Sequence, residues 1–494
     1  MTHEEERFHG GKDTTLPANH PINALSPLRK FLALSALAFC GLMGNFSVAI
    51  LMVAFVPMGA AFDVSPGDIP NTIGYQLLGV AVSSLIWCPL SKTIGRRPVY
   101  IIGSLLPIPI CVWLAESNSF GVFSAARFVM GLFSGWSQTI PPSTIADMYL
   151  PQERGRRISL YAIAVVISPA VAPVFCGLIV DKHSWRILFW FILALSGLQL
   201  AIVFFLIPET LWNWHEQTAT PQIEQDAEHK LSHEGKEAPT HLDTNSAVSV
   251  RTGRVGAAWM PWQRPGEFAR VFISPILMLR FVTITIPSIY YGSLFAWSVG
   301  ITIVAPQKFE AAPYGFETIP LGCSFLAYGI GGVLGKWSGG IVGDKVVGYF
   351  ERKKGSREPE DRLWALLPIL PFFLAACLIF GICIDKQLHW IAPLIGGGLF
   401  FFCLSAATGV LQTYVLECYL PRSMDTQAVF TFWKMIWGFA VPFFVYDWGT
   451  RVGFTQSYAI QGALATGVGF ILCLGLIWKG RAIRMAQGMP EFRK

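Results

Sequence analysis

Charge is scarce in this chain. Only 14% of its 494 residues are Asp, Glu, Lys or Arg, whereas soluble domains use about 25% charged residues. Apolar residues account for 53% of the chain. Because so little polar surface is available to face water, the composition excludes an ordinary soluble domain and indicates that lipid surrounds most of the chain.

Signatures of metal, thiol and group-transfer chemistry are missing as well. The ten cysteines show no CxxC spacing, most of them lie inside apolar runs, and no HExxH sequence or His/Cys cluster occurs. No P-loop and no nucleophile–base pattern is found. We therefore expect no disulfide framework, no metal, no cofactor and no enzymatic activity.

What the chain does contain is a series of long apolar runs. A helix needs about 20 apolar residues to cross a hydrocarbon layer of about 30 Å. Twelve runs of suitable length lie near 31–61, 69–91, 97–115, 119–141, 158–180, 187–207, 276–305, 318–343, 363–384, 391–416, 424–446 and 456–480. The sequence thus predicts an all-α polytopic membrane protein with twelve transmembrane helices, embedded in a lipid bilayer.

The net charge is +6, but the Lys and Arg residues lie in separate loops between the apolar runs and do not form one basic surface. We therefore expect no nucleic-acid partner. The loops after the second, fourth, eighth and tenth spans carry most of them: Lys92, Arg96, Arg97, Arg154, Arg156, Arg157, Lys345, Arg352, Lys353, Lys354, Arg357, Arg362 and Arg422. The opposite loops carry Lys182, Arg186, Lys308, Lys386 and Arg451. By the positive-inside rule, the first set of loops and both termini are cytoplasmic.

Hydropathy falls between residues 208 and 273, where both signs of charge mix with Ser, Thr and Pro. We interpret this stretch as a cytoplasmic central loop with room for a short surface helix. The expected domains are a tail 1–30, a six-helix bundle 31–207, the loop 208–273, a six-helix bundle 274–480 and a tail 481–494. Two such halves are typical of secondary transporters, which hold their substrate between the halves near the membrane midplane.

The sequence CPLSKTIGRR, residues 88–97, resembles the signature G-x-L-[AS]-D-R-x-G-R-R of the major facilitator superfamily. Leu90, Ser91, Gly95, Arg96 and Arg97 match, whereas Cys88, Lys92 and Thr93 replace the family's glycine, aspartate and first arginine. Over residues 30–480 the chain resembles the fungal twelve-span drug:proton antiporters in particular. This resemblance implies the major facilitator fold and transport by alternating access.

The signature implies a conformational latch, in which a glycine turn lets arginines bridge to nearby carboxylates. The expected latch residues are Gly95, Arg96, Arg97, Asp147, Glu153, Arg154, Asp344 and Lys345. Asp147 and Glu153 are the expected partners of the two arginines. With Lys92 in place of an acid, the latch is expected to be weaker or to use another partner. The alternative is that Arg96 and Arg97 only fix the topology.

Two further stretches resemble family motifs. RFVMGLFSG, residues 127–135, is similar to the R-x-x-x-G pattern associated with proton coupling, and its Arg127 shares a helix face with Gln138. The alternative for Arg127 is extension to the outer surface. SPAVAPVFCG, residues 168–177, is similar to the antiporter motif, whose Pro169, Pro173 and Gly177 imply a bent, closely packed helix and export.

Lys434 is the most informative residue outside these motifs. It lies about 15 Å into the eleventh predicted span, at ~1.5 Å per residue, which is close to the midplane. No carboxylate is expected near the midplane to pair with it or with a cationic substrate, so a neutral or anionic amphiphile is favoured. A lysine bonded to helix carbonyls is the alternative.

The predicted substrate site combines this lysine with hydrogen-bonding and aromatic side chains from other spans. Its members are Asn45, Arg127, Gln138, Tyr290, Tyr291, Trp297, Gln412, Trp433, Lys434 and Trp437. We expect a monomeric, proton-coupled exporter of drugs, toxins or secondary metabolites in the plasma membrane, with a vacuolar or other internal membrane as the alternative location. An importer or uniporter of a nutrient such as a sugar or organic acid is the alternative function.

Overall fold

The computed structural model describes residues 26–149, 151–210, 265–355, 358–419 and 422–488. For residues 151, 152, 154 and 265–270 it describes the backbone alone. Most of the predicted central loop 208–273 and of the predicted tail 1–30 therefore lies outside the described residues. Of the predicted tail 481–494, only residues 489–494 do, and its first residues continue α22 to Gln487. Within the described ranges the regular structure is entirely helical, which confirms the predicted fold class.

The helices fall into two consecutive series. The first series is α3 (Pro27–Ala49), α4 (Phe55–Phe62), α5 (Asn71–Thr93), α6 (Arg96–Leu105), α7 (Pro107–Ala115), α8 (Phe120–Ser134), α9 (Trp136–Thr139), α10 (Pro141–Met148), α11 (Pro151–Val180) and α12 (Ile187–Leu206). The second series is α14 (Pro265–Met278), α15 (Val282–Glu310), α16 (Thr318–Ser324), α17 (Leu326–Lys354), η1 (Pro359–Ala365), α18 (Leu370–Asp385), α19 (Ile391–Cys418), α20 (Ser423–Ala440), η3 (Val441–Phe443), α21 (Val445–Val452) and α22 (Phe454–Gln487).

Nine helices in the described residues are long and apolar enough to cross a membrane, and two bent helix pairs raise that number to eleven. The bent pairs are η1 with α18, at 40°, and Ser423–Phe443 with α21, at 49°. The predicted span 119–141 is divided between α8 and α9, which leaves α8 with 15 residues. The total of twelve spans therefore stays a prediction.

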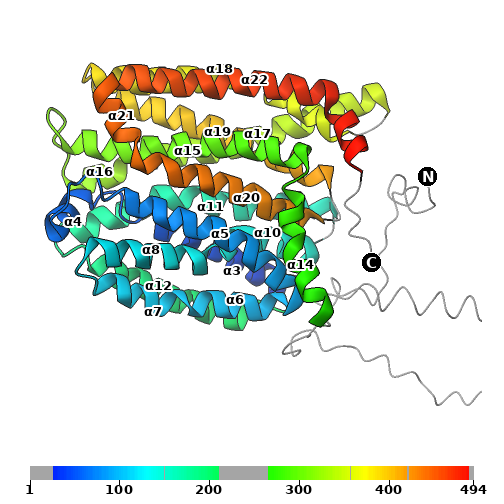
Figure 1. Ribbon diagram of the computed structural model, residues 1–494, viewed down its shortest axis with the longest axis horizontal. Helices are drawn as coiled ribbons and strands as arrows, with labels where there is room; N and C mark the ends of the chain where they lie inside the picture. The colour runs from blue at the N-terminus through cyan, green and yellow to red at the C-terminus, as the bar shows by residue number, and fades with distance from the viewer. Residues whose placement is uncertain (1–25, 150, 211–264, 356–357, 420–421, 489–494) are drawn as a thin grey trace, which may run out of the picture.

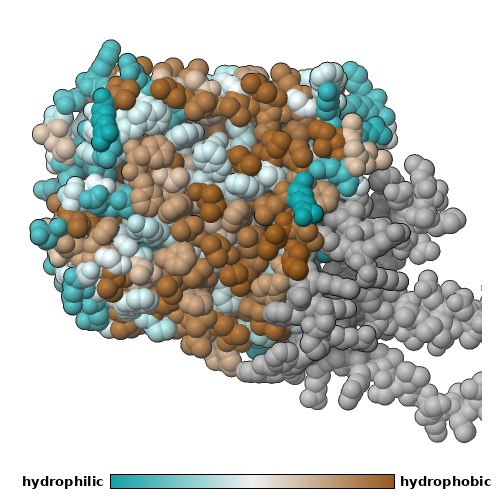
Figure 2. Space-filling model, viewed as in Figure 1, coloured by the Kyte–Doolittle hydropathy of each residue, from teal (hydrophilic) through white to brown (hydrophobic). Residues whose placement is uncertain are grey.

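The long helices run side by side along the longest axis of the molecule, with the first series below and the second above (Figure 1). The two series meet where α5 packs against α20 and where α11 packs against α16 and α17. Helix α14 crosses one end of the bundle and contacts both α5 and α20 (Figure 1). Apolar side chains cover the middle of the visible face, whereas hydrophilic residues gather toward its ends (Figure 2).

Two predicted spans differ from the helices observed. The run 31–61 is helical only to Ala49, and a turn separates α3 from the short helix α4. The run 276–305 contains the end of α14, a break at residues 279–281, and α15. Helix α14 is thus the surface helix expected near the central loop, and it begins at Pro265, a residue well suited to a first helical turn.

A glycine face on α17 determines how closely it packs. A side chain at Gly331, Gly335 or Gly339 would collide with the backbone of α19, at Gly398, Phe402 and Ala406 respectively. These three glycines, spaced four residues apart, therefore form a packing face. The packing holds α17 in a fixed position against α19. Another face of α17 contacts α11 of the first series.

Candidate functional site

A chain of hydrogen bonds crosses between the two series of helices. Lys434 Nζ on α20 donates to Gln138 Oε1 on α9 at 2.9 Å. Gln138 Nε2 donates to Asn45 Oδ1 on α3 at 2.7 Å, and Asn45 Nδ2 donates to the Val165 carbonyl on α11 at 3.1 Å. The structure therefore brings Asn45, Gln138 and Lys434 together, from segments far apart in the sequence. We call these three residues the central polar cluster.

Local helix geometry explains how Gln138 reaches the interface. Helix α8 stops at Ser134, and the next turn, α9, carries Gln138. Gly44 has no side chain, so Ser137 fits against α3, and the Tyr161 hydroxyl donates to the Ser137 carbonyl at 2.6 Å. These contacts fix the position of the α9 turn, so that the Gln138 amide lies within hydrogen-bond distance of Lys434. The ammonium of Lys434 also lies 4.9 Å from the centre of the Phe295 ring, a cation–π distance.

Lys336 is a functional candidate that the sequence analysis missed. It lies on α17 and is partly buried, one helical turn after Gly332, where a side chain would meet Val166 of the first series. Neither lysine forms an ion pair with an acid within the described part of the chain. A simple signal could have found Lys336, because it is a lone cation inside an apolar run, about as deep as Lys434.

Two other predicted residues line the second series near this cluster. The Thr408 hydroxyl on α19 donates to the Tyr291 hydroxyl at 2.8 Å, and the Tyr291 ring stacks on Phe430 with centroids 4.8 Å apart. Gln412 Nε2 donates to Gln427 Oε1 at 2.9 Å. Phe430 precedes Lys434 by one helical turn, so the stacked rings share a face of α20 with it.

The remaining predicted substrate residues lie elsewhere. Arg127 is fully buried within the first series and donates to the carbonyls of Ser47, at 2.8 Å, and Val48, at 3.2 Å. The Tyr290 hydroxyl donates to Ala465 on α22 at 2.7 Å. Trp297 packs toward Trp448, Trp437 is partly exposed, and Trp433 has a buried indole N–H with no acceptor among the described residues.

The end of the bundle that carries α14 also carries the predicted latch, and we call it the basic end. Arg96 pairs with Asp147 at 2.6 Å and donates to Ser143 and Thr144 at 2.7 and 3.0 Å. The Glu209 carboxylate accepts from the backbone N–H groups of Arg96 and Arg97, at 3.1 and 3.0 Å, where α6 begins. An acid at a helix N-terminus is electrostatically favourable. Gly95, with φ +98, makes the preceding turn.

A second arginine occupies a similar place in the second series. Arg362 pairs with Asp344 at 3.1 Å and with Glu417 at 3.0 Å. Lys345 is exposed. The expected pairing of Glu153 with Arg96 or Arg97 is wrong for the described contacts: Glu153 pairs with Arg157, one turn further along its own helix, at 3.6 Å. The side chain of Arg154 lies outside the described residues.

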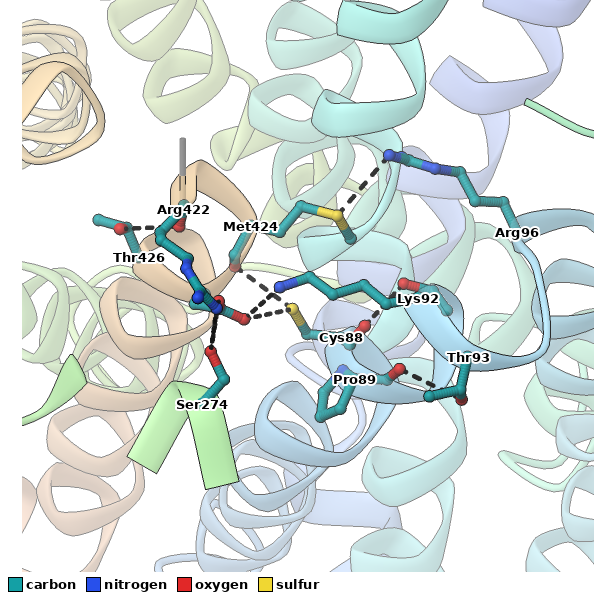
Figure 3. Close-up of polar contacts among 11 residues, drawn as sticks. Cys88, Pro89, Lys92, Thr93, Arg96, Ser274, Arg422, Met424 and Thr426 are labelled. Atoms are coloured by element: carbon teal, nitrogen blue, oxygen red, sulfur yellow. Dashed lines mark hydrogen bonds and ion pairs between the residues drawn. The ribbon is translucent and has the colours of Figure 1, made fainter. Parts of the chain in front are cut away.

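The contact that joins the two series at the basic end involves the residue that departs from the family signature. Lys92 Nζ on α5 pairs with the fully buried Asp425 on α20 at 2.5 Å (Figure 3). Asp425 also accepts from the Ser274 hydroxyl on α14 at 2.7 Å and lies 3.7 Å from Arg422. Cys88 Sγ lies 3.4 Å from the Met424 carbonyl. Lys92 thus does have another partner, across the interface.

Contacts between the two series also form at the opposite end of the bundle. A side chain at Gly177 on α11 would collide with the Thr318 carbonyl on α16, and one at Gly322 would collide with the Pro173 carbonyl. Thr318 Oγ1 donates to Asp181 at 3.2 Å. The predicted helix-bend residues Pro169, Pro173 and Gly177 therefore lie on the helix that closes this end.

A surface pocket of about 530 Å³ lies beside these contacts. Residues of both series line it, including Phe55 and Asn71 from the first and Glu310, Phe443 and Asp447 from the second. Tyr75 packs edge-to-face on Phe443 with ring centres 5.4 Å apart, below the interface between α5 and η3. None of the residues of the central polar cluster lines this pocket.

Two series of membrane-length helices that meet at a polar interface, with ionic contacts at one end, define the class of multi-pass membrane transporters. The chain belongs to the Major Facilitator Superfamily, whose family model matches residues 37–444. It is therefore a secondary transporter of small molecules and not an enzyme. The family that the signature sequence predicted is confirmed.

Named relatives are fungal transporters. Quinidine resistance protein 3 of Saccharomyces cerevisiae is 22% identical over 515 residues, which cover 79% of this chain and 74% of that protein. The MFS antiporter QDR3 of Candida albicans is 22% identical over 488 residues, covering 78% and 69%. Among solved structures, the crystal structure of a D-xylose-proton symporter superposes with a TM-score of 0.62, 15% identity, and coverage of 91% of this chain and 97% of that one. The similarity to this symporter is a similarity of fold alone.

Proposed function

We propose that this chain is a proton-coupled exporter that prefers neutral or anionic amphiphilic organic compounds. The observation that carries the proposal is the bond from Lys434 to Gln138, a cation at the interface of the two halves that has no carboxylate partner among the described residues. A carrier of organic cations needs a buried acid to pair with its substrate. The relatives named for quinidine resistance and antiport support export.

In the proposed transport cycle, the central polar cluster opens alternately to the two sides of the membrane. Opening of the basic end requires separation of Lys92 from Asp425, and opening of the other end requires separation of α11 from α16. The positive-inside rule places the basic end in the cytoplasm. Asp147 and Glu417, each paired with an arginine, and Lys434 are the titratable groups available for proton exchange.

The test is cellular accumulation of a panel of fluorescent amphiphiles in a drug-sensitive yeast expressing the chain. We expect lower accumulation of neutral and anionic members, and loss of the difference when the proton gradient is collapsed. Lys434→Met should abolish the effect, whereas the control Lys386→Met, at an exposed loop lysine, should not. Accumulation that rises with expression would instead identify an importer, and a gradient-independent flux would identify a uniporter.

A further inference from the structure

Two lysines from different helices lie deep in the second half of the protein. Lys336 is about 15 Å from the start of α17 and Lys434 about 17 Å from the start of α20, at ~1.5 Å per residue. Lys336 is about 27 Å from the other end of α17 by the same measure. A lysine side chain cannot span such distances to reach water at the ends of the bundle.

Both lysines face the interface between the halves. One turn before Lys336, a side chain at Gly332 would contact Val166 on α11 and the Ser405 hydroxyl on α19. The hydrogen-bond chain that starts at Lys434 ends on the carbonyl of Val165, the neighbour of Val166. The lipid-facing side of α17 is a different one, which Ile330, Leu334 and Trp337 occupy.

The described contacts provide the two lysines with one acceptor between them. Lys434 uses the Gln138 amide oxygen, and Lys336 has no hydrogen bond or ion pair among the described residues. Two like charges on neighbouring parts of one interface disfavour each other. A buried charge costs free energy unless a partner of opposite sign compensates it. An arrangement of two such charges is stabilised most by a ligand that brings negative oxygens.

We propose that Lys336 and Lys434 together bind one anionic group, a carboxylate or sulfonate, of an amphiphilic substrate. The ligand's oxygens replace the Gln138 amide at Lys434 and reach Lys336 on α17. Its apolar part lies on the stacked rings of Tyr291 and Phe430 and beside Phe295. This inference rests on the proposed function only in taking the bound anion to be the transported compound.

Binding to the purified full chain in neutral-lipid nanodiscs tests the site without requiring transport. The probes are 8-anilinonaphthalene-1-sulfonate and 1-naphthaleneacetate, each compared with its neutral counterpart, N-phenyl-1-naphthylamine and methyl 1-naphthaleneacetate. We expect the wild type to bind each anion more tightly than its counterpart. Lys336→Met and Lys434→Met should each weaken anion binding about ten- to a hundredfold, the value of a charge-assisted hydrogen bond, and leave the neutral probes unchanged.

Further variants separate ligand binding from a structural role. Lys336→Arg should keep the anion preference, and the ligand-free Lys336→Met protein should unfold at the same or a higher temperature, because one of two repelling charges is gone. The control Lys353→Met, at an exposed position of the same helix, should bind like the wild type. Equal affinity of the wild type for charged and neutral probes, or anion binding that survives in both Met variants, would overturn the inference.

The binding assay on the purified chain does not depend on the direction of transport. Selective anion binding that depends on Lys336 and Lys434, together with no export in cells, would leave this site standing and refute the proposed exporter. Export in cells without anion selectivity of the purified chain would refute the site alone.

Discussion

At the scale of single residues, the basic end shows that an ion pair can join the two halves whichever half carries the acid and whichever carries the base. Lys92 stands where the family signature has aspartate, and the acid lies on the other half, at Asp425. Asp425 is fully buried and is approached by Lys92, Arg422 and Ser274. Of these, only Lys92 belongs to the first half. The Lys92–Asp425 ion pair must therefore break when this end opens, together with the contacts of Cys88 with Met424 and of Ser84 with Ala428.

We predict that Lys92→Met favours opening of the basic end. Loss of the cross-interface charge removes an attraction that only the closed state has, and a change of about 1.4 kcal/mol would open the end about tenfold more often. Cys88, buried beside Met424, is a native reporter. Because Cys88 is labelled by N-ethylmaleimide only when the end is open, its labelling should be about tenfold faster in the variant. Peptide mass spectrometry measures this rate.

The matched control is Lys353→Met, which removes an exposed lysine from the same end of the bundle. It should leave Cys88 labelling at the wild-type rate. Asp425→Asn should also speed labelling, and the double variant should be less than additive, because both changes remove one contact. Unchanged labelling of Cys88 in Lys92→Met would show that the pair does not hold this end closed.

The residues that could be found from sequence are those whose chemistry conflicts with their surroundings. Lys434 is conspicuous as a cation inside an apolar run, but its partner Gln138 is brought to it by packing between the halves, which no local pattern encodes. Lys336 was hidden by the glycine repeat around it. Arg127 is fully buried, and it bonds to backbone carbonyls that are free to accept because α3 ends at Ala49.

At the scale of elements, apolar runs predicted where helices occur better than where they stop. A helix can end inside an apolar run if other groups satisfy its last carbonyls, and Arg127 does this for α3. Glycine spacing, by contrast, predicted packing well, because a missing side chain has a direct steric consequence. On α17, Gly335 lies against the Phe402 backbone, whereas Gly340 has open space around it.

We predict opposite outcomes for two substitutions on this one helix. Gly335→Ala should destabilise the protein by about 1 to 3 kcal/mol, because its methyl group overlaps a backbone carbonyl. Gly340→Ala should be neutral or stabilising by up to about 1 kcal/mol, the helix-propensity difference. Thermal unfolding in detergent, followed by tryptophan fluorescence, measures both. Equal melting temperatures for the two variants would mean that α17 and α19 are not packed as closely as described.

At the scale of the whole molecule, the two halves touch at both ends with the central polar cluster between them. At the basic end the contact is polar, through Lys92, Asp425 and the Ser84 hydroxyl, which lies 3.2 Å from the Ala428 carbonyl. At the opposite end it depends on small residues and on Thr318 with Asp181. A substrate can reach the cluster only if one of these contacts opens, and it can leave on the other side only if the second one does.

We therefore predict that a cross-link at either end stops transport. Cysteines at Ser84 and Ala428 would tie α5 to α20 at the basic end, and cysteines at Asp181 and Thr318 would tie α11 to α16 at the other. Each oxidised pair should abolish substrate flux, and a reductant should restore it, because alternating access needs both ends to open in turn. Each single-cysteine variant is the control and should transport normally in both redox states. Full flux through a protein whose cross-link at one end is verified by mass spectrometry would contradict transport between the halves, because that end would then not have to open.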